Sequence, residues 1–350
     1  MSAADGEREL LRQTAEDLLA GHCTPARVAA AAGGSDAALW QALEDTGLTL
    51  AGSPEEAGGS GGDLLAAADI AVAAGAAAAP VPLAETLAAG MLLARAGLAI
   101  PPGPLTAAVA SARDAALHRV PYGRLAMTVA TGSGEDGDWL AVIAPTGRGG
   151  TGRNLAGEPR DQVGIGPAAE VHAAPAGTAD YARRLLRLFR SLLIAGAAQR
   201  ALDLTVRYVQ EREQFGRPLA KFPTIQQELA RMAGEVALVA AAAQAAAAAE
   251  QAVAAEQAVA AEPAGDTVSA VLAAKAQASH CAGVVAAIAH QLHGAIGTTE
   301  EHRLRLTTTR LWSWRDEDGS EAECFAELGR AALGAAIRDG SLWPWLSGGG

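Results

Sequence analysis

The stretch that decides the fold reads Glu211-Arg212-Glu213-Gln214-Phe215-Gly216-Arg217-Pro218-Leu219. Gly216 and Pro218 are turn residues, so one helical pattern ends here and a second begins just after the turn. The turn leaves a guanidinium, an amide and an aromatic ring together at one corner, on Arg212, Gln214 and Phe215. A guanidinium can bind phosphate through two hydrogen bonds, and a phenyl ring offers a face to a heterocycle. The corner therefore predicts a site for a ligand that carries phosphates and an aromatic ring.

The composition favours a mostly helical protein of two or three packed units. The chain has 350 residues, half of them hydrophobic, and only 4% are aromatic. Much of the hydrophobic half is alanine, the strongest helix former. The net charge of -12 argues against a nucleic-acid partner, because phosphate backbones require a basic surface.

Other bulk features predict a soluble, reduced, cytoplasmic protein that does not cross a membrane. No window holds about 20 uninterrupted large apolar residues, and the charged start of the chain does not read as a signal peptide. The three cysteines are widely spaced and give neither a disulfide framework nor a zinc pattern. His290 and His293 lie three apart on a helical pattern, but no carboxylate ligand accompanies them. We expect packing or capping roles for both, and no metal.

Changes in composition and in the predicted secondary structure divide the chain into three predicted domains. Residues 1–104 read as helices interrupted by a glycine-rich turn, with Asp36 and Asp63 placed to cap helices. Residues 105–177 read as a small β module, with strands at 125–131 and 139–144 around a hairpin loop. Residues 178–345 read as an antiparallel four-helix bundle, in which the last helix follows Gly319.

A second motif accompanies the corner further along the chain, Gln291-Leu292-His293-Gly294-Ala295-Ile296-Gly297. Together the two motifs resemble the C-terminal domain of the acyl-CoA dehydrogenases, FAD enzymes that desaturate acyl-CoA thioesters. Residues 53–61, Ser-Pro-Glu-Glu-Ala-Gly-Gly-Ser-Gly, look like an N-terminal turn of the same family. The resemblance implies that family's fold: an N-terminal helical domain, a middle β domain, here reduced, and the bundle.

The resemblance also implies cofactor contacts across a subunit interface. In that family the corner and the glutamine-glycine turn hold the ADP half of a FAD that is bound mainly by the neighbouring protomer. Carried over by position, Arg212 would meet the diphosphate and Phe215 the adenine side. Gln291 and Gly294 would meet the adenosine diphosphate. Gln214 and Ala295 belong to the same predicted cofactor site.

The catalytic base matches the family less well. Desaturation needs a base for the α-proton while hydride leaves the β-carbon for the flavin, and a carboxylate in a dry pocket serves as that base. In many members it is a glutamate about 27 residues after the glutamine of the glycine turn, a spacing that reaches Asp318 here, one methylene shorter. The family's other base position corresponds to Leu186, beside Arg187. Asp318 is therefore the one candidate base, and the competing interpretation is that residues 316–318 form a charged, solvated loop.

The β module departs from the family as well. Its Thr-Glu-Pro-x-(Ala/Gly)-Gly-Ser-(Asp/Asn) loop, which contacts the flavin ring, has no counterpart between Leu105 and Ala176. The chain resembles the subunits of actinobacterial heteromeric acyl-CoA dehydrogenases that lack base and flavin loop, which often carry a stretch like 314–320, Trp-Arg-Asp-Glu-Asp-Gly-Ser. We therefore expect a FAD-dependent acyl-CoA dehydrogenase subunit that assists α,β-dehydrogenation of an acyl-CoA thioester beside a catalytic paralogue. Two alternatives stay open: a self-sufficient homo-oligomer that uses Asp318, or a non-enzymatic scaffold. The sequence does not identify the acyl chain.

Overall fold

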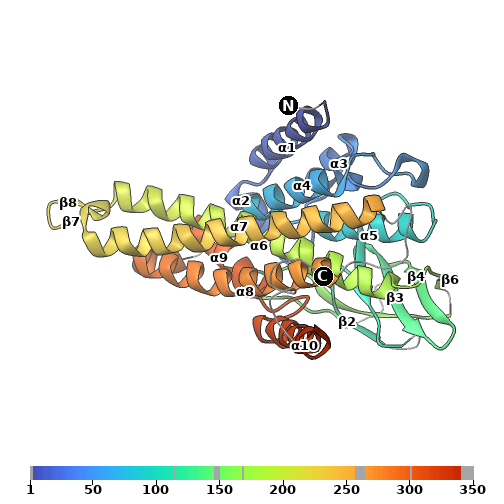
Figure 1. Ribbon diagram of the computed structural model, residues 1–350. Coiled ribbons are helices and arrows are strands. Elements are labelled where there is room, and N and C mark those ends of the chain that lie inside the picture. The colour runs from blue at the N-terminus through green and yellow to red at the C-terminus, as the bar shows by residue number, and fades with distance from the viewer. Residues whose placement is uncertain are drawn as a thin grey trace.

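The computed structural model describes residues 3–112, 116–145, 150–167, 169–256, 265–299 and 302–339. It is mainly helical, with two small sheets at one end of a long bundle (Figure 1). The last residues of the third predicted domain, 340–345, lie outside the described residues.

Five helices open the chain and cover one side of the bundle (Figure 1). The predicted caps are confirmed: the Asp36 carboxylate accepts from the Leu39 amide, and that of Asp63 from the Ala66 amide. Short 3-10 turns at Leu48–Leu50 and Glu55–Ala57 lie between the third and fourth helices. The five helices are α1 (Ala3–His22), α2 (Pro25–Ala30), α3 (Ala37–Asp45), α4 (Leu64–Ala77) and α5 (Leu83–Arg95).

The first sheet has the strand order β1-β3-β4-β6, with β1 parallel to β3 and the other pairs antiparallel. The predicted hairpin is confirmed, but its strands run further than expected, down to a tight turn between Gly134 and Gly137. The second sheet pairs β2 with β5 and has a bulge between Leu117 and Val120. The strands are β1 (Leu105–Val109), β2 (Ala116–Pro121), β3 (Met127–Gly134), β4 (Gly137–Ile143), β5 (Arg160–Gly164) and β6 (Glu170–Ala173).

Three long helices form the body of the bundle: α6 (Thr178–Glu211), α7 (Pro223–Glu256) and α8 (Gly265–His293). The hairpin β7 (Glu213–Gln214) and β8 (Arg217–Pro218), followed by a 3-10 turn at Leu219–Lys221, joins α6 to α7 at the end away from the sheets (Figure 1). α6 packs against α4 with very close backbones, because a Cβ on Gly196 would lie 1.9 Å from the carbonyl oxygen of Val72. That contact joins the N-terminal helices to the bundle.

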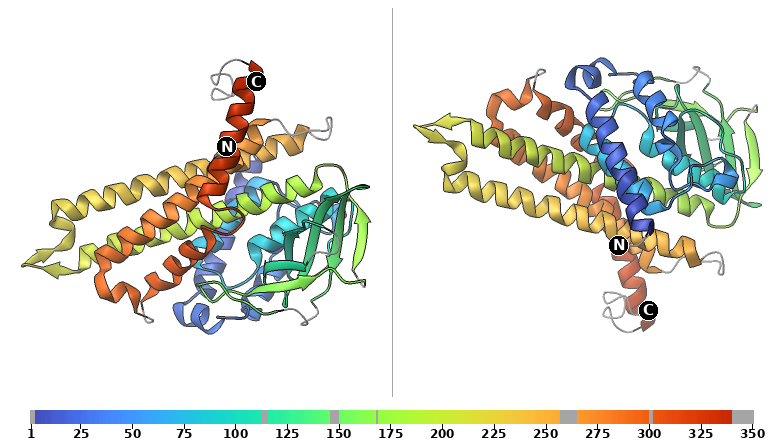
Figure 2. Two further views of the ribbon diagram at one scale, coloured as in Figure 1. Left: turned by 90° about the horizontal axis from the view of Figure 1, so that it is seen from below. Right: turned by 90° about the horizontal axis from the view of Figure 1, so that it is seen from above.

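The end of the chain differs from the expected four helices. After the 3-10 turn η4 (Gly294–Thr298), a helix that the sequence analysis missed, α9 (Arg303–Trp314), packs against α6 and α8. Its run of three threonines has a low helix propensity, and burial of Leu304, Leu311 and Trp314 compensates. The last helix, α10 (Glu321–Asp339), contacts α8 near its start and then projects from the body (Figure 2).

α7 and α8 are long and apolar enough to cross a membrane by composition alone. The core helices of a soluble protein pass the same test, and two thirds of the apolar window around α8 is buried in the fold. In α7 the 4-3-4-3 spacing of apolar residues from Ile225 to Val239 predicts one buried face. Met232, Val236 and Val239 are buried against the other helices, and Ile225 and Leu229 are partly buried there. The apolar character of both helices thus has a structural use within the bundle.

Candidate functional site

The corner is a two-residue hairpin whose tip is formed by Phe215 and Gly216. Both have positive φ angles, 52° and 77°, as a type I′ turn requires. Asn-Gly or Asp-Gly is preferred there, and a bulky residue with left-handed backbone costs about 1–2 kcal/mol. The Phe215 side chain is nevertheless 91% exposed, so burial does not offset that cost. A strained aromatic residue displayed to solvent is a reason to look for a ligand or partner.

Of the other side chains of the corner, one is engaged by an aromatic ring and two are exposed and could contact a ligand. The Arg217 guanidinium lies 4.2 Å from the centre of the Phe222 ring, and Phe215 meets the same ring edge-on with centroids 6.2 Å apart. Arg212 is exposed and has no ion pair among the described residues, and Gln214 is exposed on β7. Arg212 is thus the guanidinium of the corner that is available for an anion.

The structure brings the glutamine-glycine turn to the same end of the bundle. Tyr208, four residues before Arg212, stacks on His293 with ring centroids 4.3 Å apart, and its hydroxyl donates to the His293 carbonyl at 3.3 Å. Gln291, Gly294 and Ala295 flank that histidine, and all three are exposed. The two motifs, about 80 residues apart in the sequence, therefore lie on adjoining helix ends.

The histidines beside this turn have packing roles. His290 stacks on Trp312 with ring centroids 5.0 Å apart and bonds the Thr308 hydroxyl at 2.8 Å. His293 bonds the carbonyl of Ala289 through Nδ1. Burial lowers the pKa of both rings, so they are neutral at pH 7. Among the described residues, no cluster of ligating side chains could hold a metal ion.

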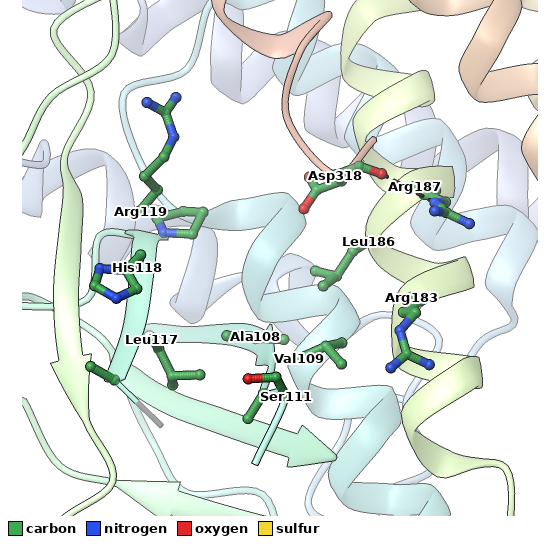
Figure 3. Close-up of a pocket in the computed structure, with 14 residues that line it drawn as sticks. Ala108, Val109, Ser111, Leu117, His118, Arg119, Arg183, Leu186, Arg187 and Asp318 are labelled. Carbon is green, nitrogen blue, oxygen red and sulfur yellow. Dashed lines mark hydrogen bonds between the residues drawn. The ribbon is translucent and has the colours of Figure 1, made fainter. Parts of the chain in front are cut away.

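The two base positions from the family spacing line one pocket of about 450 Å³ at the opposite end of α6. Asp318 and Leu186 lie next to each other on one side of it, across from His118 and Arg119 of β2 (Figure 3). The strand β1 forms the floor with small side chains such as Ala108 and Val109 (Figure 3). Sequence spacing and folded geometry therefore agree on where a base would be.

The carboxylate of Asp318 is not free in this pocket. Its Oδ2 accepts from Nε of Arg190 at 2.9 Å, and the Arg190 side chain is only 4% exposed. Two more guanidiniums, those of Arg183 and Arg187, also line the pocket, and Arg187 is held by both carboxylate oxygens of Glu327 on α10. A base for an α-proton needs an unpaired carboxylate in apolar surroundings. This one is already paired with a cation.

Further inward, the interior is occupied by paired charges. Arg190 also contacts Glu85 of α5 at 3.4 Å and Glu317 at 3.3 Å. Arg160 binds both oxygens of Glu317 at 2.7 and 2.8 Å and contacts Glu158 at 3.1 Å, while Arg310 contacts Glu158 at 3.0 Å. We call these side chains the buried ion network: Glu85, Glu158, Arg160, Arg190, Arg310, Glu317 and Asp318. Sequence analysis missed it, because its members come from five separate segments and no local pattern connects them.

The pKa values of the carboxyl groups in the buried ion network shift in different directions. Burial works against ionisation of Glu158, yet Arg310 and Arg160 lower its pKa to about 2. Burial opposes ionisation of Glu317 too, but Arg190 and Arg160 bring its pKa below the usual range. For Glu85 burial is the stronger effect, and its pKa is raised in spite of Arg190. Four carboxyl groups face three guanidiniums here, so a protonated Glu85 leaves the network neutral.

A lysine fixes the turn that carries Asp318. Lys275 of α8 is fully buried, and its ammonium donates to the carbonyls of Arg315 and Gly319, at 3.0 and 2.6 Å, and to the Ser279 hydroxyl at 2.7 Å. Burial lowers the pKa of Lys275 to about 8. Asp318 itself has a left-handed backbone, with a φ of 58°. These bonds tie both ends of the turn to α8. The interpretation as a solvated loop is wrong for Glu317, which is 8% exposed, whereas Asp316 is exposed as that interpretation expects.

The residues present fit one half of FAD and not the other. The exposed arginine, ring and glutamine-glycine turn match the chemistry of an adenosine diphosphate. For the flavin ring, no counterpart of the family's loop sequence occurs between Leu105 and Ala176, the connection from β1 to β2 included. The pocket beside that connection is lined by arginines on the α6 side.

Comparison with known proteins gives two family profiles and several relatives. Residues 5–99 match "Acyl-CoA dehydrogenase, N-terminal domain", and residues 179–321 match "Acyl-CoA dehydrogenase, C-terminal domain". The chain is 34% identical over 315 residues to acyl-CoA dehydrogenase IpdE2 of Mycobacterium tuberculosis, which covers 86% of this chain and 89% of the relative. It is 32% identical over 328 residues to IpdE2 of Mycolicibacterium smegmatis, with coverage of 86% and 90%.

Solved structures share the fold. The Tcur3481-Tcur3483 steroid ACAD G363A variant superposes with a TM-score of 0.83 at 24% identity, over 96% of this chain and all of that one. The ChsE4-ChsE5 complex from Mycobacterium tuberculosis gives a TM-score of 0.81 at 21% identity, over 94% and 97% of the two chains. The expected fold class is confirmed by both comparisons.

Proposed function

Because the chain belongs to the acyl-CoA dehydrogenase family of oxidoreductases, we propose that it is the non-catalytic subunit of a heteromeric member. In this proposal it binds the ADP half of a FAD whose flavin ring and catalytic base belong to a paralogous partner. The FAD supplies the hydride acceptor for α,β-dehydrogenation of an acyl-CoA thioester. The observation that carries the proposal is the pairing with Arg190 of Asp318, the one candidate base that the sequence offers.

Each residue of the corner has a role in this proposal. The unpaired guanidinium of Arg212 binds the diphosphate, and the displayed ring of Phe215 faces the adenine side. The exposed Gln291 side chain and the backbone around Gly294 and Ala295 complete the contact with the adenosine diphosphate, and Gln214 supports the same corner. Two solved neighbours carry names that describe pairs of chains, Tcur3481-Tcur3483 and ChsE4-ChsE5, which supports a heteromer here. A cytoplasmic location belongs to the proposal and is supported by the acidic composition.

The decisive experiment is to co-express the chain with a paralogue that has the flavin loop and the glutamate, and to measure FAD per complex. Arg212→Ala should weaken FAD binding by roughly 10- to 100-fold, because a charge-assisted hydrogen bond contributes about 1.5–3 kcal/mol. Arg217→Ala is the matched control, since that guanidinium is occupied by Phe222, and FAD content should change little. Unchanged FAD content in Arg212→Ala would support the scaffold alternative instead.

The self-sufficient alternative is tested separately through Asp318. If the partner supplies the base, Asp318→Asn leaves the turnover of the complex within about twofold. If Asp318 is the base, removing it should slow turnover by about 10²-fold or more. A yellow, active preparation of this chain alone would also contradict the proposed division of labour.

A further inference from the structure

A second hollow lies along the middle of α6, on the side that faces the N-terminal helices. Its end at Arg303 adjoins His302, whose ring lies 5.0 Å from that of His293 beside the glutamine-glycine turn. Its volume is about 610 Å³, within the usual range of about 300–1,000 Å³ for small-molecule sites. It is bounded by the later parts of α1 and α4, by the joint between α1 and α2, by the middle of α6 and by the first residue of α9. We call it the α1–α4–α6 groove.

The floor of the groove is apolar and hollow because its side chains are small. Ala73, Ala76 and Ala77 of α4 line it together with Gly196 of α6 and Leu19 of α1. Gly196 is fixed by the close contact with α4, so no larger side chain can fill the space from there. Cys23 adds a neutral thiol, because burial raises its pKa to about 11. The floor therefore suits a hydrocarbon chain or ring.

The rim of the groove carries guanidiniums that form no ion pair with the described residues. Arg200 of α6 and Arg303 of α9 line the rim. Arg207 lies two helical turns further along α6, on the same face as Arg200. Burial lowers the pKa of Arg200, and the nearby guanidiniums of Arg207 and Arg303 lower it further, against the opposite effect of Asp203. Among the described residues, none of the three has a carboxylate within 4 Å.

Two carboxylates also line the groove, and among the described residues neither forms an ion pair with Arg200 or Arg303. Asp203 attracts Arg200 but accepts its hydrogen bond from the Gln199 amide, at 2.8 Å. Glu16 is paired with Arg12 on the outer side of α1, at 2.5 Å. Like charges held close together without partners cost stability, and an oxyanion between them would relieve that cost.

We propose that the α1–α4–α6 groove binds a small amphiphilic oxyanion, with its apolar body on the alanine floor and its charged head between Arg200 and Arg303. The head is a carboxylate or a phosphate monoester, since a guanidinium binds either through two hydrogen bonds. The volume and the unpaired cations favour a small molecule over a protein segment. The inference is independent of the proposed function, because it concerns neither FAD nor Asp318.

Isothermal titration calorimetry of the full chain with decanoate and with decyl phosphate tests the proposal. Saturable binding of either probe is expected, and the tighter probe identifies the head group. The Arg200→Gln/Arg303→Gln variant should weaken binding by at least about tenfold. The matched control is Arg231→Gln/Arg330→Gln, which removes the same charge from exposed positions on α7 and α10 and should bind like wild type.

A second variant guards against misfolding as an explanation. Ala76→Leu fills the floor and leaves the arginines in place, so it should weaken decanoate more than acetate. Failure of both probes to bind, or equal weakening in the control variant, would overturn the proposal. So would binding that disappears in the complex with the paralogue, because the groove would then be a subunit interface. FAD content stays unchanged in every outcome, which separates this test from that of the corner.

Discussion

The two ends of α6 differ in whether their charged side chains are buried and paired. At the sheet end, Arg190 is buried and contacts three carboxylates, and the pocket beside it contains an aspartate that is already paired. At the far end, Arg212 is exposed and forms no ion pair with any residue that the structure describes, next to a phenyl ring displayed on a strained turn. The charged groups at the sheet end are paired with each other, whereas Arg212 and Phe215 at the far end are exposed to solvent. Under the proposed division of roles, the sheet end lacks the free base that the chemistry needs, and the far end contacts a FAD held by the partner.

Arg190→Met should have the largest effect on stability. The substitution leaves Glu85, Glu317 and Asp318 without a shared cation in the interior, and breaking a buried ion pair in this way costs about 3–5 kcal/mol. Urea denaturation of wild type and variant at pH 7 measures the loss. Arg183→Met is the control, because its pair with Asp180 is solvent-exposed and should contribute far less. Equal losses in both variants would mean that the buried ion network has no special role.

Two glutamates in the network should respond differently to the same change. Glu317→Gln removes a carboxylate that two buried arginines hold ionised, and about 2–4 kcal/mol should be lost at pH 7. Glu85→Gln resembles the protonated form that burial already favours, so stability should stay within about 1 kcal/mol. Unfolding free energies at pH 7 compare the two directly. A larger loss for Glu85→Gln would show that the charge of the network is distributed differently.

The pH dependence of unfolding follows from the same shifts. Glu158 and Glu317 have pKa values below those of unfolded glutamates, about 4.3, so their stabilisation is complete above pH 5. It is lost as the pH falls toward 2, where Glu158 is protonated. Glu85 has a raised pKa and therefore contributes with the opposite sign, favouring the fold at low pH. Glu317→Gln should consequently lose less stability between pH 5 and 3 than wild type does.

Phe215→Ala, at the corner, should have the smallest effect on stability of the substitutions considered. It tests whether the exposed ring serves FAD binding rather than the fold. The ring is 91% exposed, so its removal should change the unfolding free energy by less than about 0.5 kcal/mol. FAD retention by the complex should fall nevertheless, because the adenine side loses its aromatic contact. Thermal unfolding with and without FAD separates the two quantities. A large loss of stability without FAD would mean that the ring has a structural role in the hairpin.

Local pattern was enough to predict the helices of the bundle other than α9, two N-terminal caps and the turn at the corner. Asp36 and Asp63 cap where expected, and the apolar spacing of α7 identified its buried face, because each signal lies within one turn or one helix. The missed helix α9 is a case where burial against α6 and α8 outweighs weak helix formers, which a single segment does not reveal. Family spacing placed Leu186 and Asp318, and the fold brought both to one pocket.

The sequence alone determined the fold class and the identity of the residues displayed at the corner, because turn chemistry and periodicity act over short distances. The tertiary structure decided which charges have partners. Asp318 reads as a candidate base until Arg190, 128 residues earlier in the chain, is seen to bind it. Whether a carboxylate is free to act as a base depends on burial and on cations contributed by distant segments, and a local sequence pattern contains neither.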